Sequence, residues 1–206
     1  FDYRNFGRKT VRRKELGIAV VGAGRIGTLR ARLAAKHPSV NFLAISDRDP
    51  ARARSLAEQA GADFHSRDNI EIISRPEVNA VIVSTPEGEH AAAVCKALEL
   101  GKPVLVEKPI ALTLEDADQI LATLRQTGGS LRVGYSRRFK ECYLRAKEQM
   151  VQGRLGRVVG GTARGVLKLL TGQLYEFEEI ALPEFLGGGL LASLQLVEPL
   201  TDRPFG

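Results

Sequence analysis

The sequence LGIAVVGAGRIG, residues 16–27, joins an apolar run to three closely spaced glycines. The apolar run predicts a buried strand, and the helical spacing of apolar residues after it predicts a helix. At such a turn Gly22 permits the tight bend, Gly24 lets the main chain approach a pyrophosphate, and Gly27 allows close packing of the helix. Free N–H groups at the helix N-terminus favour phosphates. We therefore expect a dinucleotide-binding turn, whose candidate cofactor-binding residues are Gly22, Gly24, Arg25, Ile26 and Gly27.

Short β-rich runs alternate with longer helical patterns after this turn, as expected of βαβ units around a parallel sheet. Residues 80–84 (AVIVS) contain a continuous Val/Ile run, which is typical of a central strand covered on both faces. We expect an α/β fold with a doubly wound parallel sheet (Rossmann), followed by a truncated α+β domain. The predicted strands are 16–21, 40–46, 63–64, 80–84, 103–106 and 131–135, and the predicted helices are 26–36, 50–61, 68–73, 87–100, 113–128 and 138–152.

We expect the chain to divide into a basic N-terminal arm (1–15), an NAD(P)-binding domain (16–135) and a C-terminal part (136–206). Within the last part, residues 157–169 have the glycine-broken, β-branched character of a strand pair or a long bulged strand. The pattern becomes irregular after Leu170, so we predict no further elements there.

The composition, 44% apolar and 26% charged residues, excludes disordered, fibrous and disulfide-dense classes. The longest stretch without a charge, residues 185–197, is far shorter than the roughly 18–20 apolar residues that cross a bilayer, so we expect no membrane partner. Cys95 and Cys142 are too few and too far apart for a disulfide framework or a metal cluster. We therefore expect no metal and a cytoplasmic location.

The positive charge is concentrated at one end of the chain. Of the formal net charge of +6, residues 1–15 hold +4 through six basic and two acidic side chains. A basic arm on a nearly neutral body is typical of a solvated tail, because such tails resist aggregation without a partner. The sequence therefore disfavours nucleic acid as a partner.

An acidic residue, Asp47, follows the second predicted strand, 20 positions after Gly27. This spacing suits a carboxylate that accepts hydrogen bonds from both hydroxyls of the adenosine ribose and repels a 2′-phosphate, which favours NAD. The next residue, Arg48, leaves NADP as the alternative, because a guanidinium there can pair with the 2′-phosphate. Arg48 can equally be a solvated side chain or a cation stacked on adenine.

Polar residues also follow the fourth predicted strand. Ser84, Thr85 and Pro86 end this strand, and His90 comes within the first turn of the next helix. Ligands of open α/β sheets bind outside the carboxyl ends of the strands, so these residues are expected to face the same cleft as the glycine turn. Taken alone, His90 is also compatible with a surface or helix-terminus histidine.

The fifth predicted strand ends in the same way, at Glu107, Lys108 and Pro109. Pro109 disfavours helical conformation at Lys108 and fixes the direction of the chain, which would aim the ammonium group into the cleft. A lysine at the end of a core strand beside a carboxylate is a candidate functional group, although an isolated lysine is usually solvated.

Together these residues resemble the Gfo/Idh/MocA family of NAD(P)-dependent oxidoreductases. The likeness covers roughly residues 16–165, more loosely beyond the sixth predicted strand, and the Glu-Lys-Pro element at this separation from the glycine turn is specific. The stretches that carry it are 20–27 (VVGAGRIG), 84–86 (STP) with His90, 107–109 (EKP), 134–139 (GYSRRF) and 156–159 (GRVV).

The resemblance implies hydride transfer between a nicotinamide cofactor and a hydroxyl or ketone of a cyclic polyol or sugar, as in inositol dehydrogenases. It implies that Lys108 is the catalytic lysine and that Glu107 and Arg137 face the nicotinamide half of the cofactor. It also admits a cis peptide between Lys108 and Pro109. A lysine suits this chemistry, because a base must take the hydroxyl proton as the hydride leaves.

This sequence departs from the family pattern further along the chain. The family completes the proton path with an Asp and a His in a glycine-rich segment, but here Ser193 and Val197 stand at those places, and no histidine follows Lys108. About 70 residues follow the sixth predicted strand, too few for the family's second domain, which forms the substrate floor. We therefore expect a fragment, a chain that lacks internal residues, or a degenerate member. In each case the resemblance implies that residues 136–206 are a partial or degenerate substrate and dimerisation domain.

Two functions stay open at this point. One is an NAD(P)-dependent oxidoreductase acting on a polyol or sugar, whose full-length relatives we expect to be homo-oligomers. The other is a catalytically inactive dinucleotide-binding module of the same family that acts as a sugar-responsive regulator, which the missing Asp and His favour. The sequence alone leaves it open whether this chain is itself an enzyme.

Overall fold

The computed structural model describes residues 15–156, 161–168, 174–181 and 195–199. The chain divides into two compact units, one through Tyr135 and one from Ser136. Residues 1–14 of the basic arm lie outside the described residues, and so does Ser193. None of the helices among the described residues is long and apolar enough to cross a membrane.

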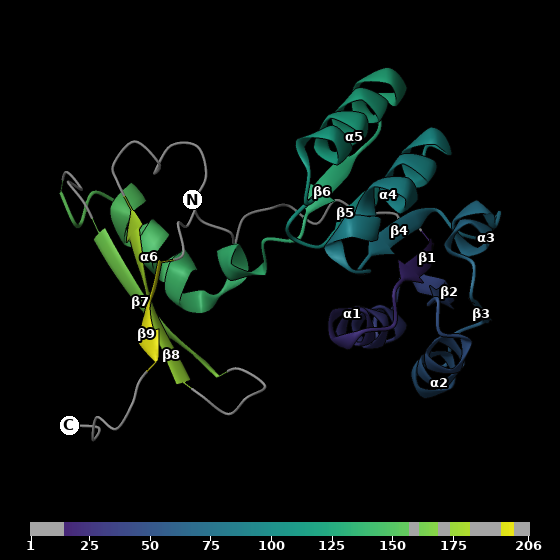
Figure 1. Ribbon diagram of the computed structural model, residues 1–206, viewed down its shortest axis with the longest axis horizontal. Coiled ribbons are helices and arrows are strands. Elements are labelled where there is room, and N and C mark those ends of the chain that lie inside the picture. Colours follow the sequence, from purple (N-terminus) through teal and green to yellow (C-terminus); the bar gives the residue numbers. More distant parts are fainter. Residues whose placement is uncertain (1–14, 157–160, 169–173, 182–194, 200–206) are drawn as a thin grey trace, which may run out of the picture. The chain divides into compact units, whose positions relative to one another are not determined.

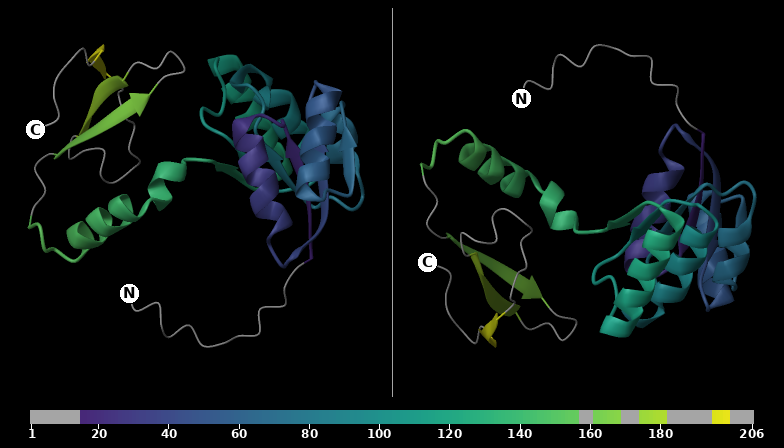
Figure 2. Two further views of the ribbon diagram at one scale, coloured as in Figure 1. Left: turned by 90° about the horizontal axis from the view of Figure 1, so that it is seen from below. Right: turned by 90° about the horizontal axis from the view of Figure 1, so that it is seen from above.

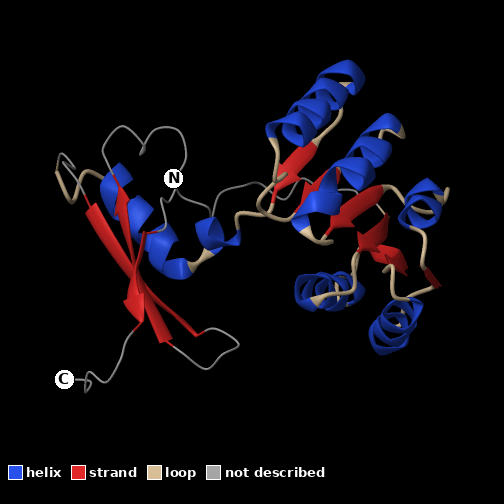
Figure 3. Cartoon of the chain, viewed as in Figure 1, coloured by secondary structure: helices blue, strands red, loops and turns tan. Residues whose placement is uncertain are grey.

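The first unit is built on one parallel sheet of six strands (Figure 3). The spatial order of its strands is β3-β2-β1-β4-β5-β6, which confirms the predicted doubly wound fold. Strand order reverses between β1 and β4, and ligands of such sheets bind at this switch point. The strands are β1 (Leu16–Val21), β2 (Val40–Ser46), β3 (Phe64–Ser66), β4 (Ala80–Val83), β5 (Val104–Val106) and β6 (Leu131–Val133).

Helices cover both faces of this sheet (Figures 1 and 2). On one face α1 (Arg25–Ala35) and α2 (Pro50–Ala60) pack against Ile18 and Val20 of β1. On the other face lie α3 (Asn69–Ser74), α4 (His90–Glu99) and α5 (Leu114–Thr127). Successive β1 side chains point to opposite faces, so two separate cores form, and this double burial explains why β1 and β4 are continuous apolar runs.

Short-range signals in the sequence set the ends of these helices. Asp49 caps α2 by accepting a hydrogen bond from the Ala51 N–H at 2.9 Å, and Gly61 ends it in left-handed conformation with φ 65°. Asp68 caps α3 through the Ile70 N–H at 2.8 Å. The predicted cap of α5 is also confirmed, because Thr113 accepts from the main-chain N–H of its third helical residue at 3.1 Å.

Three predicted elements of this unit differ from the structure by two residues or more. Strand β3 covers Phe64–Ser66 and so ends two residues beyond the predicted 63–64. The helix predicted over 87–100 is divided into a 3₁₀ turn, η2 (Glu87–Glu89), and α4, because Glu89 (φ −106°, ψ 3°) departs from α-helical geometry. Strand β6 ends at Val133, two residues before the predicted end. Gly134 there packs against a side chain from the end of β5, where a Cβ would come within 3.1 Å of a carboxylate oxygen.

The second unit contains η3 (Ser136–Phe139), α6 (Glu141–Val151) and an antiparallel sheet in the order β7-β8-β9. The helix predicted over 138–152 is interrupted by Lys140, which is extended (φ −71°, ψ 137°). Of residues 157–169, predicted as a strand pair or one long bulged strand, the described part forms one strand, β7 (Gly161–Lys168), which pairs with β8 (Leu174–Ala181) without a register shift. A register shift occurs instead in the pairing of β8 with β9 (Gln195–Pro199). The last two strands were not predicted.

Candidate functional site

The turn between β1 and α1 needs glycine at two of its three glycine positions for packing. Gly22 has φ +97°, and a Cβ there would come within 2.7 Å of the Ser84 carbonyl group. A Cβ on Gly27 would lie 1.8 Å from the Gly22 carbonyl oxygen, so only glycine lets α1 approach the turn this closely. Gly24 is exposed, and a Cβ there would have no described atom within 4 Å. The space beside Gly24 is therefore open to a ligand.

Asp47 connects the end of β2 to this turn. Its Oδ2 accepts a hydrogen bond from the Ala23 N–H at 2.7 Å, and its Oδ1 accepts one from the Asp49 N–H at 2.9 Å. A carboxylate has about four acceptor sites, so Asp47 keeps capacity for the ribose hydroxyls that the sequence assigned to it. The sequence did not indicate that Asp47 also fixes the shape of the glycine turn.

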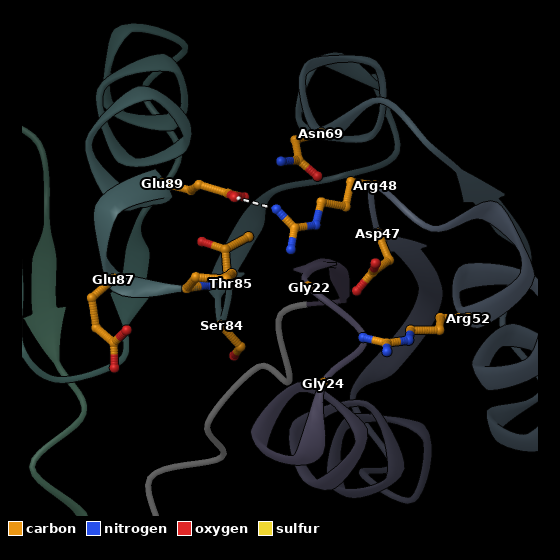
Figure 4. Close-up of a pocket in the computed structure, with 11 residues that line it drawn as sticks. Gly22, Gly24, Asp47, Arg48, Arg52, Asn69, Ser84, Thr85, Glu87 and Glu89 are labelled. Carbon is orange, nitrogen blue, oxygen red and sulfur yellow. Dashed lines mark hydrogen bonds and ion pairs between the residues drawn. The ribbon is translucent and has the colours of Figure 1, made fainter.

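The glycine turn opens on a pocket of about 210 Å³ outside the carboxyl ends of the strands (Figure 4). Arg25 and Ile26 lie in the first turn of α1 and do not line this pocket. Within the described residues, the buried hydroxyls of Ser84 and Thr85 have no hydrogen-bond partner. Buried hydroxyls seldom stay unpaired, so these two suit the polar groups of a dinucleotide. The predicted residues that line the pocket are Gly22, Gly24, Asp47, Arg48, Ser84, Thr85 and Pro86.

Two arginines at the pocket already have carboxylate partners from the chain itself. The Arg48 Nη1 atom lies 3.1 Å from Glu89 Oε1, and Figure 4 shows the two side chains reaching toward each other from the loop after β2 and from η2. The Arg52 Nε atom lies 3.4 Å from Asp49 Oδ2. These side chains are largely exposed, and exposed ion pairs contribute little stability. Both arginines can therefore change partners when a ligand binds.

His90 is the first residue of α4, as the helix-terminus alternative predicted, but it is neither a surface histidine nor among the residues that line the pocket. Its side chain is 0% exposed. The Nε2 atom lies 3.0 Å from the Thr85 carbonyl oxygen, and Nδ1 lies 3.0 Å from that of Pro109 and 3.3 Å from that of Ile110. A ring enclosed in this way presents no surface to a ligand, so the structure does not support the predicted direct contact of His90 with the cofactor.

Glu107 at the end of β5 is paired with a residue that sequence reasoning missed. Its Oε1 accepts hydrogen bonds from Arg30 of α1, from Nε at 2.9 Å and from Nη2 at 2.5 Å. The two side chains are only 14% and 22% exposed, so this pair is better shielded from water than the arginine pairs at the pocket. It ties α1 to the end of β5, and the role of Glu107 toward nicotinamide stays a prediction.

Lys108 is exposed at the start of the loop after β5, and the Lys108–Pro109 peptide is cis, as the resemblance admitted. Arg137 belongs to the second unit, within η3, and its side chain lies outside what the structure describes. The catalytic role of Lys108 and the cofactor role of Arg137 therefore stay predictions.

Four residues that line the pocket were not predicted. Glu87 and Glu89 directly follow Pro86, so the rule that ligands bind beyond the carboxyl ends of strands could have included them. Asn69, at the start of α3, accepts a hydrogen bond from Ser46 Oγ at 2.7 Å, and no local pattern indicates it. The unpredicted residues are Arg52, Asn69, Glu87 and Glu89. Across the described ranges, no group of three or more His, Cys, Asp or Glu side chains is placed to hold a metal ion.

Residues 16–135 match the model of the Gfo/Idh/MocA oxidoreductase family, which has an NAD-binding Rossmann fold. The chain belongs to this family. Among curated relatives, scyllo-inositol 2-dehydrogenase (NAD(+)) of Bacillus subtilis is 34% identical over 142 residues, which is 68% of this chain and 42% of the relative. Inositol 2-dehydrogenase 1 of Saccharopolyspora erythraea is 37% identical over 150 residues, 71% of this chain and 43% of the relative. The chain thus spans less than half the length of these Gfo/Idh/MocA proteins.

Solved structures of the Gfo/Idh/MocA type agree with the sequence match. The scyllo-inositol dehydrogenase from Lactobacillus casei, solved with bound NAD(H) and scyllo-inositol, is similar with a TM-score of 0.67 and 27% identity. The likeness covers 73% of this chain and 45% of that one. The NAD-binding domain predicted from the glycine turn is therefore confirmed for this Gfo/Idh/MocA chain.

Proposed function

We propose that this chain is the NAD-binding part of a dehydrogenase that oxidises a secondary hydroxyl of a cyclic polyol to a ketone. One observation carries the cofactor part of the proposal: the open position of Gly24 and the unpartnered hydroxyls of Ser84 and Thr85 occur in one pocket. The inositol dehydrogenases among its relatives support the substrate class. They favour a dehydrogenase over the sugar-responsive regulator.

The pocket residues suit different parts of NAD. The main chain at Gly24 and the N–H groups of the first turn of α1 would hold the pyrophosphate, since both a close main-chain approach and free donors are present there. Asp47 would accept hydrogen bonds from the adenosine ribose, and the hydroxyls of Ser84 and Thr85 would bind polar groups of the cofactor. When bound, NAD supplies a carbon centre that accepts a hydride.

Lys108 would handle the proton of the reaction. In its neutral form the amine accepts the hydroxyl proton while the hydride leaves the same carbinol carbon, so the products are a ketone, NADH and a lysine ammonium. Its exposed position leaves the amine accessible to a substrate. Ser193 cannot supply the charge of a carboxylate, and no histidine follows Lys108, so this chain does not complete the proton path by itself.

Calorimetric titration of the 206-residue chain with NAD and with NADP tests the cofactor part. We expect saturable binding of both at one site, with NAD the tighter ligand, because Asp47 repels a 2′-phosphate. Absence of NAD binding to a folded chain would refute the proposal. A clear preference for NADP would instead transfer the specificity role from Asp47 to Arg48.

Absorbance of NADH in the presence of myo-inositol, scyllo-inositol or glucose tests the chemical part. At saturating NAD we expect turnover well below about 1 s⁻¹, the lower end of ordinary enzyme rates, because orientation and proton transfer both need groups that this chain does not supply. Faster turnover would show that the proton path is complete within these residues, and would leave the proposed cofactor site intact.

A further inference from the structure

His90 is an unusual residue within the first unit. Among the described residues, Ser46 and His90 are the only polar residues that are buried as a whole, and both are 0% exposed. Burying an imidazole is unfavourable unless its nitrogens find partners. The ring of His90 finds them in two loops: Nε2 lies 3.0 Å from Thr85 O, and Nδ1 lies 3.0 Å from Pro109 O.

These two loops follow neighbouring strands and carry different parts of the candidate site. The loop after β4 contributes the unpartnered hydroxyl of Thr85 to the pocket, and the loop after β5 presents Lys108. The hydrogen bonds between the two strands end with the Glu107 N–H donating to the Val83 carbonyl at 2.9 Å. Beyond that point, no main-chain hydrogen bond within the described residues joins 84–86 to 108–110, and the polar connection runs through the ring of His90.

The chemistry of imidazole decides which of the two carbonyls receives a hydrogen bond. A neutral ring has one N–H, so it donates to one loop and turns an unprotonated nitrogen toward the carbonyl of the other, whereas an imidazolium donates to both. In either form the rigid ring fills the space between the two carbonyl oxygens. An apolar side chain of similar size would remove the hydrogen bond that the ring donates.

We propose that His90 is a positioning residue that holds the Thr85 loop and the Lys108 loop in register, so that the cofactor pocket and the lysine are preformed. This inference rests on the proposed function, because the positions of the two loops matter only if the pocket binds NAD and Lys108 acts on the substrate. The connection between the two loops can be tested without that function. His90 does not touch the cofactor or the substrate; it acts through Thr85 and Pro109.

Three substitutions separate the two contacts. The amide nitrogen of His90→Asn reaches about as far as Nδ1 and retains a donor for Pro109 O, while that of His90→Gln reaches about as far as Nε2 and retains one for Thr85 O. His90→Leu retains neither. His65→Leu is the matched control, because His65 is an exposed histidine on β3, remote from these loops in the strand order.

The measurements are NAD affinity by calorimetry and hydrogen exchange of peptides covering 84–90 and 107–112. For His90→Leu we expect NAD affinity to fall about tenfold, as for loss of one good hydrogen bond, and both peptides to exchange faster. His90→Gln should keep NAD affinity within about threefold of the wild type while 107–112 exchanges as fast as in His90→Leu. His90→Asn should protect 107–112 and leave NAD binding weak. His65→Leu should match the wild type.

Two results would overturn the inference. One is wild-type affinity and exchange in His90→Leu. The other is an equal change in all three His90 variants that follows only their loss of thermal stability and also appears in peptides of β2 and α2. A purely structural role predicts such a uniform change, whereas the proposal predicts opposite effects in His90→Gln and His90→Asn. Failure of the wild-type chain to bind NAD would refute the proposed function instead, and the exchange measurements would still test the connection between the loops.

Discussion

Replacing Gly24 should separate cofactor binding from folding. Gly24 is the N-cap of α1 with φ −70° and ψ −172°, which any residue adopts, and a Cβ there meets no described atom within 4 Å. Loss of a favourable N-cap costs about 0.5–1 kcal/mol. Reduced freedom of the unfolded chain offsets this cost by about 0.4–1 kcal/mol. We therefore expect the free energy of unfolding of Gly24→Ala to stay within about 1 kcal/mol of the wild type.

The effect on NAD should be much larger. A pyrophosphate displaced by one Cβ loses one or two hydrogen bonds to its charged oxygens, each contributing about 1.5–3 kcal/mol. The expected loss of affinity is at least about tenfold, and Gly24→Val should abolish binding. Urea unfolding and calorimetric titration measure the two quantities. Gly27→Ala is the contrasting variant, because a Cβ 1.8 Å from the Gly22 carbonyl oxygen should cost about 3 kcal/mol of stability. Wild-type NAD affinity in Gly24→Ala would refute the placement of the pyrophosphate.

Other variants test the remaining parts of the site. Glu89→Gln should release Arg48 for the 2′-phosphate and raise NADP affinity about threefold to fivefold in calorimetry. Glu87→Gln removes the same charge without breaking an ion pair to Arg48, so it should raise NADP affinity less. Equal effects of the two variants would show that only the net charge of the pocket matters. Lys108→Ala should leave NAD affinity within a few-fold, and a much larger loss would make it a binding residue. Lys102→Met should lower the urea-unfolding free energy by about 1–3 kcal/mol and leave NAD affinity unchanged. The reason is that the Lys102 ammonium donates hydrogen bonds at 2.5 and 2.8 Å to two main-chain carbonyls near the end of α3. Wild-type stability of this variant would contradict the prediction.

The fold of the first unit could be predicted because its information is local. Strand β1 begins and ends where the apolar run 16–21 does, since a strand covered on both faces needs an unbroken apolar run. Strand β2 also has the predicted bounds, 40–46, although Asn41 interrupts its apolar residues. Glycine and acidic caps set the ends of α2 and α3. The second unit was harder, because β8 (LYEFEEIA) lacks strict alternation of apolar and polar residues and its pairing partners are set by tertiary structure.

The site residues that could be predicted from the sequence are those whose residue type has a single structural role at that position of the fold. Gly22, Gly24 and Asp47 fall in this class. His90 does not, because spacing places it beyond β4 but cannot tell a ring facing the cleft from one turned between two loops. Arg30 was missed for a similar reason: its partner Glu107 is 77 positions away, and only the packing of α1 against the sheet brings them together.

A titration of the ¹⁵N-labelled chain with NAD, followed by the backbone amide resonances, tests the central claim most directly, because it reports both whether the cofactor binds and where. The account predicts saturable changes that are largest for the glycine turn and for the main chain next to Asp47 and Thr85. Smaller changes should occur in α5, and the resonances of exposed β3 residues should move little. Absence of saturable changes in a well-folded spectrum, or changes confined to residues outside the pocket, would contradict the assignment of this turn as the NAD site.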